Sequence, residues 1–311
     1  MSRVNVIIPT YKPDEKFIKL IDRLEKQTVK PERIIVMNTE QKYFDRLIYG
    51  THFLEKHKTV ETHHISKREF DHGRTRHIGM QKADSEYVLF MTQDAVPADG
   101  KLVEQLLLAV QEKNVAVAYA RQLPDKNCGV IESYTRQFNY PEQGMVKSAR
   151  DIEKLGIKTY FCSNVCAMYK KSVYDELGGF VRHTIFNEDM IFAAGAIKAG
   201  YKIVYKPEAQ VIHSHNYTNK EQLKRNFDLG VSQAEHPEIF AEISSGQEGK
   251  KLVKQTADYL RKSGNSKYLV KLVMQSGCKY LGYLLGKNYK KLPKKMVQSL
   301  TSNKTFWDND R

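Results

Sequence analysis

The 311-residue sequence lacks the long apolar run that a membrane-spanning helix requires. Such a helix needs about 20 consecutive, mostly apolar residues, and no stretch of that kind occurs, so no transmembrane helix is expected. The first residues also lack a charged region followed by a long apolar stretch, and we therefore expect no secretory signal. With 41% apolar residues, the composition still supports a substantial core and argues against disorder.

Cysteine is scarce, since the chain has only four. Cys162 and Cys166 are separated by three residues, but no second cysteine pair or nearby histidine completes a zinc-binding set. This pattern argues against a structural zinc site. We expect reduced thiols, buried or half-buried, in a cytosolic protein.

Acidic residues are scarce only near the C-terminus. The net charge is +14, yet residues 247–311 contain 15 Lys and Arg against 4 Asp and Glu, whereas the preceding 246 residues carry a charge of +3. A basic tail attracts polyanions, either nucleic acid or an anionic membrane surface. No RNP-like, KH or zinc-finger pattern accompanies it, so we do not expect nucleic acid as a partner.

The first 120 residues alternate between strand-like and helix-like runs. Their apolar periodicity predicts strands at 4–9, 33–38, 59–65, 87–92 and 115–120, and helices at 14–27, 75–83 and 102–112. Asp14 suits the N-cap of the first helix. This order predicts an α/β protein with a mostly parallel sheet and helices on both faces.

The second half is less regular. We expect an irregular segment at 123–160, a strand at 161–169, a helix at 187–199 ended by Gly200, and short strands at 201–205 and 209–213. From Asn219 onward the pattern is helical, with a break bracketed by Gly246 and Gly249. The length allows one large domain, or one domain with an appendage.

Polar residues at predicted strand ends form a candidate metal site, because ligands of such sheets bind beyond the carboxyl ends of the strands. Asp94 follows an apolar strand and suits a divalent cation that bridges a diphosphate, although a turn cap before Pro97 is the alternative. His213 ends a later strand and can complete a shell of carboxylate and phosphate oxygens. His215 is the second choice, because we expect that one strand cannot aim both rings at the same point.

The acid pair Glu188-Asp189 stands at the start of a predicted helix. Sugar transfer with inversion needs a carboxylate beside the acceptor hydroxyl and a cation beside the leaving diphosphate, without a covalent intermediate. Asp189 is the candidate base, and Glu188 is expected to hold an acceptor hydroxyl or to form part of the helix cap. The alternative is an acid pair that the helix dipole favours at this position.

A basic turn precedes the helix predicted at 75–83. Gly73 allows close backbone approach, and a helix start flanked by Arg74 and Arg76 suits an anion. A turn with a purely structural role is the alternative.

In this order, these motifs resemble the family 2 glycosyltransferases, which are inverting enzymes with the GT-A (Rossmann-like) fold. The resemblance covers roughly residues 4–215. Within the family, the stretches FDHGRTRHIG at 70–79 and TQDAVP at 92–97 are similar to bacterial rhamnosyltransferases that use dTDP-β-L-rhamnose. The resemblance implies Mg²⁺ or Mn²⁺ as the cofactor and a nucleotide sugar as the donor. The residues it implies for the donor site are Pro9, Thr10, Tyr11, Asn38, Glu40, Arg74, Gln93 and Asp94.

The resemblance also implies the catalytic and metal-binding roles. Asp94 matches the last acid of the metal-binding DxD motif, His213 matches a later metal ligand, and Asp189 matches the base of the ED pair. Two positions depart from the family pattern: Thr92 replaces the first acid of DxD, and Asn38 replaces an acid that contacts the nucleoside in many members. A thymidine donor lacks the ribose 2′-hydroxyl, which is compatible with the second replacement.

The basic tail alternates apolar and aromatic pairs with lysines. Lys271 and Lys279 interrupt the apolar run, so we expect it to lie on an anionic membrane surface rather than to cross a bilayer. The alternative is a set of helices that pack on the catalytic domain or form the seam of a homo-oligomer. We expect a catalytic domain at 1–218, with a nucleotide-sugar half at about 1–122 and an acceptor half at about 123–218, and a helical extension at 219–311.

The sequence therefore predicts a metal-dependent glycosyltransferase at the cytoplasmic face of a bacterial cell membrane. Following the resemblance, it would transfer L-rhamnose from dTDP-β-L-rhamnose to a lipid-linked or growing cell-surface polysaccharide, with a polyprenyl diphosphate as the expected lipid anchor. One alternative keeps the fold and uses UDP-hexose or UDP-galactofuranose. Another is a non-catalytic basic protein that binds polyanions or membranes.

Overall fold

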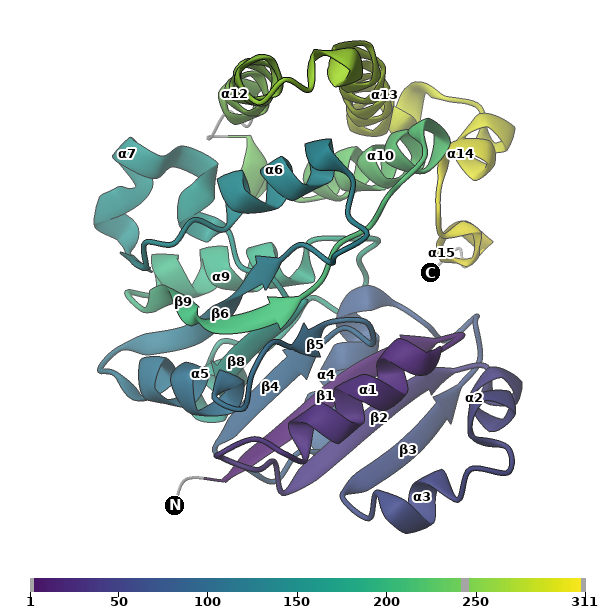
Figure 1. The fold of residues 1–311 in the computed structure, drawn as a ribbon, viewed down its shortest axis with the longest axis vertical. Coiled ribbons are helices and arrows are strands. Elements are labelled where there is room, and N and C mark those ends of the chain that lie inside the picture. Colours follow the sequence, from purple (N-terminus) through teal and green to yellow (C-terminus); the bar gives the residue numbers. More distant parts are fainter. Residues whose placement is uncertain (1–2, 242–245, 309–311) are drawn as a thin grey trace.

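The computed structural model describes residues 3–241 and 246–308, which form a mixed β-sheet covered by helices, with further helices at the C-terminal end of the chain (Figure 1). The sheet has the strand order β3-β2-β1-β4-β8-β6-β9-β5, and β7 pairs with β9 outside this path. The strands are β1 Val4–Tyr11, β2 Arg33–Thr39, β3 Val60–Ile65, β4 Tyr87–Met91, β5 Val96–Pro97, β6 Val115–Leu123, β7 Met145–Lys147, β8 Cys166–Lys170 and β9 Lys202–Ile212.

The N-terminal half of the sheet is parallel, as its alternating strand and helix pattern predicts. β1 pairs in parallel with β2 and β4, and β2 pairs in parallel with β3. β8 then lies antiparallel between β4 and β6, and β9 continues in parallel with β6. The prediction of an α/β fold with a mostly parallel sheet is confirmed, and the carboxyl ends of β1, β2, β3 and β4 share one edge.

Helices cover both faces of this sheet because each carries an apolar face. The helices up to β9 are α1 Glu15–Leu24, α2 Gln41–Ile48, α3 Phe53–Lys56, α4 His72–Lys82, α5 Leu102–Gln111, α6 Val130–Asn139, α7 Ile152–Leu155, α8 Lys171–Glu176 and α9 Glu188–Lys198. α1 and α5 pack on one face, whereas α4 and α9 pack on the other, so the apolar core has two layers. Asp14 caps α1 as predicted, since its side chain accepts from the Lys16 N–H.

Three expectations for the second half are wrong. The segment expected to be irregular contains α6, and the two short strands form a single β9 with a register shift opposite β6. Gly249 does not break the chain, because α12 begins at Gly246 and continues through it. α6 was missed because it packs on a distant element: Ile131 packs with Leu260 of α12, and Tyr134 stacks on Tyr259 at 4.5 Å.

Among the C-terminal helices, α10 and α13 pack directly on each other. The elements after β9 are α10 Asn219–Glu235, α11 Pro237–Phe240, α12 Gly246–Lys262, α13 Leu269–Lys287, α14 Lys294–Leu300 and α15 Lys304–Asp308. A Cβ on Gly282 would lie 2.2 Å from the Leu223 carbonyl oxygen, and one on Gly286 would lie 2.1 Å from that of Phe227. The backbones of α10 and α13 therefore touch, which only glycine allows. We call this contact the glycine seam.

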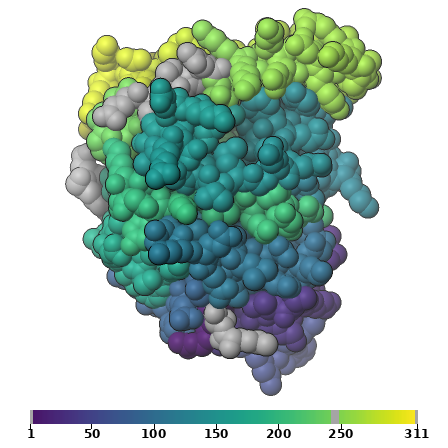
Figure 2. All heavy atoms as spheres, turned by 90° about the vertical axis from the view of Figure 1, so that its left-hand side faces the viewer, coloured from purple at the N-terminus to yellow at the C-terminus, as the bar shows by residue number. Residues whose placement is uncertain are grey.

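The last described helix, α15, packs on the loop before α9. The Phe306 ring of α15 stacks on His183 with centroids 4.4 Å apart, and Asp228 of α10 accepts from the Thr301 hydroxyl. In the space-filling view, residues of α12 and α13 project as a ledge at the top of the molecule (Figure 2). Within the described ranges, no helix is both long and apolar enough to span a membrane.

Candidate active site

Three side chains from two distant segments form a cluster of potential metal ligands. Asp94 follows β4, and both His213 and His215 follow β9. The Asp94 carboxylate oxygens lie 3.5 Å from His213 Nε2 and 3.3 Å from His215 Nε2, and the two ring nitrogens are 3.0 Å apart. One donor atom from each residue lies within 4.8 Å of the others. One carboxylate and two imidazole nitrogens fit a divalent cation.

The expectation that the rings of His213 and His215 could not reach one point is wrong. β9 ends at Ile212, so His213 and His215 lie in the loop beyond it. The chain turns there, and the His215 ring packs on Tyr217 with a centroid distance of 4.9 Å. His215 therefore belongs to the cluster together with His213.

The buried His213 ring is oriented by Gln122 of β6, whose Oε1 lies 2.9 Å from His213 Nδ1. The Gln122 amide nitrogen donates to Tyr140 Oη and Ser163 Oγ. The Gln122 oxygen also accepts from Arg136. Because this oxygen can only accept, the Nδ1–H group of His213 must be the donor to it. This tautomer leaves the Nε2 lone pair facing the cluster. Burial, with the charge of Arg136, holds the pKa of His213 well below its ordinary value, so the ring is neutral, as metal ligation requires.

Asp189 lies in the first turn of α9, and each of its carboxylate oxygens has a backbone donor. Oδ2 accepts from the Asn164 N–H at 2.9 Å, and Oδ1 accepts from the Met190 N–H at 2.8 Å. Burial raises the pKa of Asp189 to about 7, and the charge of Glu188 adds to the rise. A carboxylate that gains and loses its proton near neutral pH suits general base catalysis.

The neighbouring Glu188 is buried and engaged within the protein. Its Oε1 accepts from Asn164 Nδ2 at 3.0 Å and lies 3.2 Å from Arg76 Nη1. Burial opposes its ionisation, but the charges of Arg76 and His72 bring the pKa of Glu188 below its ordinary value. Glu188 is thus ionised and only 5% exposed, which favours a positioning role over contact with an acceptor.

The start of α9 is fixed by an unusual backbone conformation at Asn187. Its φ angle of 65° lies in the left-handed region, which asparagine tolerates better than most residues. The Asn187 side chain donates to Ser232 of α10 at 3.2 Å, and the Ser232 hydroxyl donates to the Phe186 carbonyl at 2.7 Å. Helix α10 therefore helps to place the acid pair.

Asp189 and the metal-ligand cluster are linked through two adjacent residues. Gln122, which orients His213, donates to Ser163, and the next residue, Asn164, holds both acids. Burial raises the pKa of Tyr140 to about 12, and the nearby charge of Asp189 contributes to this rise. The structure thus brings positions 94, 189 and 213 into one region of the molecule.

The basic turn before α4 does not form the anion site that we expected at its backbone. Asp71 occupies the helix start, since its Oδ1 accepts from the N–H groups of Gly73 and Arg74 and its Oδ2 from that of Thr184. A Cβ on Gly73 would lie 1.8 Å from the Val181 carbonyl oxygen, so the close approach is made by the protein itself. Arg74 is half-buried on the first turn of α4.

Residues expected to line the nucleotide site lie at the carboxyl ends of β1 and β2. Asn38 is fully buried: its Oδ1 accepts from the Thr10 hydroxyl at 2.9 Å, and its amide nitrogen lies 3.0 Å from His64 Nδ1. Both ends of this amide are used internally, so Asn38 supports Thr10 instead of offering a free group. The Glu40 carboxylate accepts from the Lys67 N–H at 2.9 Å and closes the loop after β3.

Gln93 ties the Asp94 turn to β1. Its side-chain amide pairs with the Tyr11 backbone, accepting from N–H at 2.8 Å and donating to the carbonyl at 3.1 Å. Pro9 is half-buried, whereas the Tyr11 ring is 38% exposed and packs edge-on against Tyr43 at 5.7 Å. Of these residues, Tyr11 has the most surface available to a ligand.

Sequence reasoning missed the residues that orient the predicted ones. Gln122 stands just after the predicted strand at 115–120, where a polar residue at a strand end was a usable signal. Asn164 lies in a segment expected to be strand, and the strand begins later, at Cys166. Nothing local indicated that Asn164 would hold both Glu188 and Asp189.

Sequence comparison with known proteins shows which family this chain resembles. The model of the family described as "Glycosyl transferase family 2" matches residues 5–178. The chain is 37% identical over 309 residues to the O-antigen chain rhamnosyltransferase RfbN of Salmonella typhimurium, covering 99% of this chain and 96% of that protein. It is also 37% identical over 312 residues to the O-antigen chain rhamnosyltransferase WbaN of Salmonella anatum, covering 99% and 97%.

Solved structures support the fold at lower identity. The mannosyltransferase PcManGT from Pyrobaculum calidifontis, in complex with GDP-Man and Mn²⁺, gives a TM-score of 0.54 at 14% identity, over 98% of this chain and 84% of that one. Residues 1–349 of S. aureus TarS in complex with UDP-GlcNAc give 0.51 at 15% identity, over 93% and 92%. The GT-A-like architecture predicted from the sequence is confirmed.

Proposed function

This chain belongs to glycosyl transferase family 2 and is a glycosyltransferase, and from that premise we propose that it transfers L-rhamnose from dTDP-β-L-rhamnose, with inversion, to a lipid-linked O-antigen-type polysaccharide. One observation carries the proposal: a single carboxylate with a pKa of about 7 is linked through the adjacent residues Asn164 and Ser163, and through Gln122, to a cluster of metal ligands. Family membership leaves no support for the alternative of a non-catalytic basic binding protein.

Asp189 is the proposed base. As the acceptor hydroxyl attacks the anomeric carbon, its proton passes to the Asp189 carboxylate, and the bond from that carbon to the diphosphate oxygen breaks on the opposite face. The N–H groups of Asn164 and Met190 hold the carboxylate in place for this transfer. Glu188 is committed to Arg76 and Asn164, so Asp189 is the one member of the acid pair left to accept the proton, which suits a single displacement with inversion.

The metal-ligand cluster is the proposed site for the departing diphosphate. Asp94, His213 and His215 would hold Mn²⁺, which suits two nitrogen donors better than Mg²⁺, a cation bound mainly through oxygen. When bound, the cation would neutralise the negative charge that develops on the leaving group. Thr92, at the position of the first acid of DxD, adds no charge, and His215 supplies a further ligand in its place.

The donor pocket is proposed at the carboxyl ends of β1 and β2. Thr10, oriented by Asn38, and the exposed Tyr11 ring would contact the nucleotide, with Pro9 and Glu40 shaping the pocket and Arg74 by its base or diphosphate. Asn38 gives no acidic group for a ribose 2′-hydroxyl, which is compatible with thymidine. The names of the two 37% identical relatives favour rhamnose over UDP-hexose or UDP-galactofuranose.

A donor panel tests this assignment. The purified enzyme with Mn²⁺ is incubated with dTDP-β-L-rhamnose, UDP-glucose, UDP-galactofuranose or GDP-mannose and a synthetic polyprenyl-diphosphate-linked acceptor, and release of free nucleoside diphosphate is measured. We expect dTDP release at least tenfold above that of the other nucleotides. Preferential turnover of a UDP sugar would overturn the rhamnose assignment and leave the site intact.

We also propose that α13 docks on an anionic membrane surface. Its outward side chains recur at helical spacing and are strongly exposed: Val270 71%, Val273 68%, Met274 54%, Leu281 50% and Leu284 39%. Lys267, just before α13, and Lys271 within it are exposed, and cations beside an exposed apolar stripe complement anionic lipid headgroups. Lys279 lies on the other side of the helix, near Glu132 and Arg136 of α6, so it does not interrupt the stripe as the sequence suggested.

Point variants test this docking surface in the full chain. We expect V273D/M274D to reduce sedimentation with vesicles of phosphatidylethanolamine and 30% phosphatidylglycerol at least fivefold, with activity on a water-soluble acceptor unchanged. The matched control is V146D, at another exposed apolar position, in β7. Unchanged vesicle binding together with conversion of a dimer to a monomer would overturn docking and assign the stripe to a homo-oligomer.

A further inference from the structure

The guanidinium of Arg225, on α10, is held over two aromatic rings at the border of the candidate active site. Its carbon Cζ lies 4.7 Å from the centroid of Phe186 and 5.5 Å from that of Tyr217. Aromatic faces favour a cation at such distances and fix the guanidinium plane. The residue is otherwise exposed, so its donors are open to a ligand.

Within the described part of the chain, Arg225 has no acidic partner, and its guanidinium lies over these two rings. Two other arginines beside the site are neutralised: Arg76 pairs with Glu188 at 3.2 Å and Arg136 pairs with Glu132 at 2.7 Å. An arginine that is positioned but not paired is suited to bind an anion from solution.

The two rings connect Arg225 to both parts of the site. Tyr217 stacks on His215, one of the three metal-ligand candidates. Phe186 stands directly before Asn187, which starts the helix of the acid pair. Through these two rings Arg225 adjoins both the metal-ligand cluster and the segment that starts α9.

The scaffold keeps Arg225 in this place. Thr218 and Glu221 form a capping box at the start of α10, where the Thr218 hydroxyl accepts from the Glu221 N–H. Leu223 and Phe227 flank Arg225 in sequence, and their carbonyls meet the glycine seam of α13. Helix α10, which carries Arg225, is thus fixed by the capping box at its start and by its backbone contact with α13.

We infer that Arg225 is a diphosphate-binding residue of this enzyme, its planar fork receiving the oxygens of a phosphate group that lies against the metal-ligand cluster. The inference rests on the proposed function and deepens it, since it places a residue from the predicted C-terminal extension in the active site. Two diphosphates share this chemistry: that of the departing nucleotide, which the proximity to His215 favours, and that of the lipid-linked acceptor.

The test measures binding as well as activity, with Arg225→Gln, Arg225→Lys and the matched control Lys220→Gln, an exposed cation on the same helix. Titration calorimetry with Mn²⁺ uses dTDP and dTMP, or UDP and UMP if the wild type prefers uridine. We expect Arg225→Gln to weaken diphosphate binding about tenfold or more and monophosphate binding less than threefold, because a charge-assisted bond to the second phosphate is lost. Arg225→Lys should recover part of the loss, and Lys220→Gln should match the wild type.

A second arm separates the two diphosphates through the KM for the polyprenyl-diphosphate-linked acceptor. Unchanged dTDP affinity with an acceptor KM raised at least fivefold in Arg225→Gln would support phosphate binding and assign it to the acceptor. Unchanged values in both arms, with the variant folded by circular dichroism, would overturn the inference. A wild type that binds UDP in place of dTDP would contradict the donor proposal alone, and the Arg225 comparison would proceed with UDP.

Discussion

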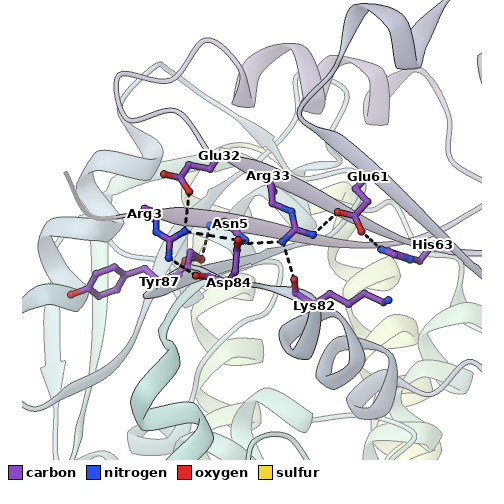
Figure 3. A network of polar contacts seen from close by, with 10 residues as sticks. Arg3, Asn5, Glu32, Arg33, Glu61, His63, Lys82, Asp84 and Tyr87 are labelled. Atoms are coloured by element: carbon purple, nitrogen blue, oxygen red, sulfur yellow. Dashed lines mark hydrogen bonds and ion pairs between the residues drawn. The ribbon is translucent and has the colours of Figure 1, made fainter.

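The two edges of the parallel sheet treat charge in opposite ways. At the edge where the strands begin, the arginines have acidic partners: Arg33 lies 2.5 Å from Glu61 and 3.2 Å from Asp84, and Arg3 lies 3.9 Å from Glu32 (Figure 3). At the edge where the strands end, Asp94 faces two neutral histidines, and Arg225 has no acid within the described residues.

The pKa directions at the two edges differ in the same way. The hydrogen bond from Arg33 lowers the pKa of Glu61, and the one from Asn5 lowers that of Asp84. Burial instead raises the pKa of Asp189 to about 7. Charged groups that already have partners stabilise the fold, whereas charged groups without partners are available to bind a ligand or a proton.

The largest expected effect comes from removing the proposed base at the ligand-binding edge. Asp189→Asn keeps the shape of the side chain but cannot accept a proton, so we expect kcat to fall by about 10³-fold, within the range for loss of a general base. Affinity for dTDP with Mn²⁺ should stay within about threefold of the wild type, because the base faces the acceptor. Steady-state kinetics and calorimetry check both values, and turnover close to the wild type would remove Asp189 from the mechanism.

Next in size is the loss of the carboxylate that faces the two histidines. Asp94→Ala should abolish the Mn²⁺-dependent part of dTDP binding, which we expect to strengthen binding about tenfold or more in the wild type. Calorimetry with Mn²⁺ and with EDTA measures that part directly. If Mn²⁺ still strengthens binding as much in the variant, the metal is held elsewhere.

A smaller and graded effect is expected from pH. Since the folded pKa of Asp189 is about 7, kcat/KM should rise about tenfold per pH unit below pH 7 and level off above it.

The raised pKa of Asp189 also means that the folded state binds a proton that the unfolded state has lost, so this group's contribution to stability falls as pH rises from about 4 to about 7. Asp189→Asn should accordingly gain stability relative to the wild type over that interval, measured by urea unfolding. A pH-independent difference would contradict the burial of this carboxyl.

The smallest effect is expected at the paired edge. Arg33→Met removes two partly exposed ion pairs, to Glu61 and Asp84, so the free energy of unfolding should fall by only about 1 kcal/mol. Activity and dTDP affinity should remain at wild-type values, because this network lies at the strand starts. A large loss of activity would contradict the division of roles between the two edges.

Local periodicity predicted most of the first 120 residues, because each strand and helix there is stabilised by its own apolar face. It did not predict α6, whose apolar face packs on α12, far along the chain. It also did not predict that β8 joins the sheet antiparallel to β4. Within the site, Asp94, His213 and Asp189 were identifiable from strand ends and an acid pair. His215 was ranked second because the loop after Ile212 could not be foreseen, and Asn164 and Arg225 depend on contacts between distant segments.

The glycine seam means that α13 cannot be exchanged between related enzymes separately from α10. Any residue with a side chain at Gly282 or Gly286 would push α13 away from α10, and α10 carries both Ser232, which contacts Asn187, and Arg225. A chimera would have to take both sides of the seam from one parent. Substrate choice and membrane attachment are therefore expected to change together as such enzymes diverge.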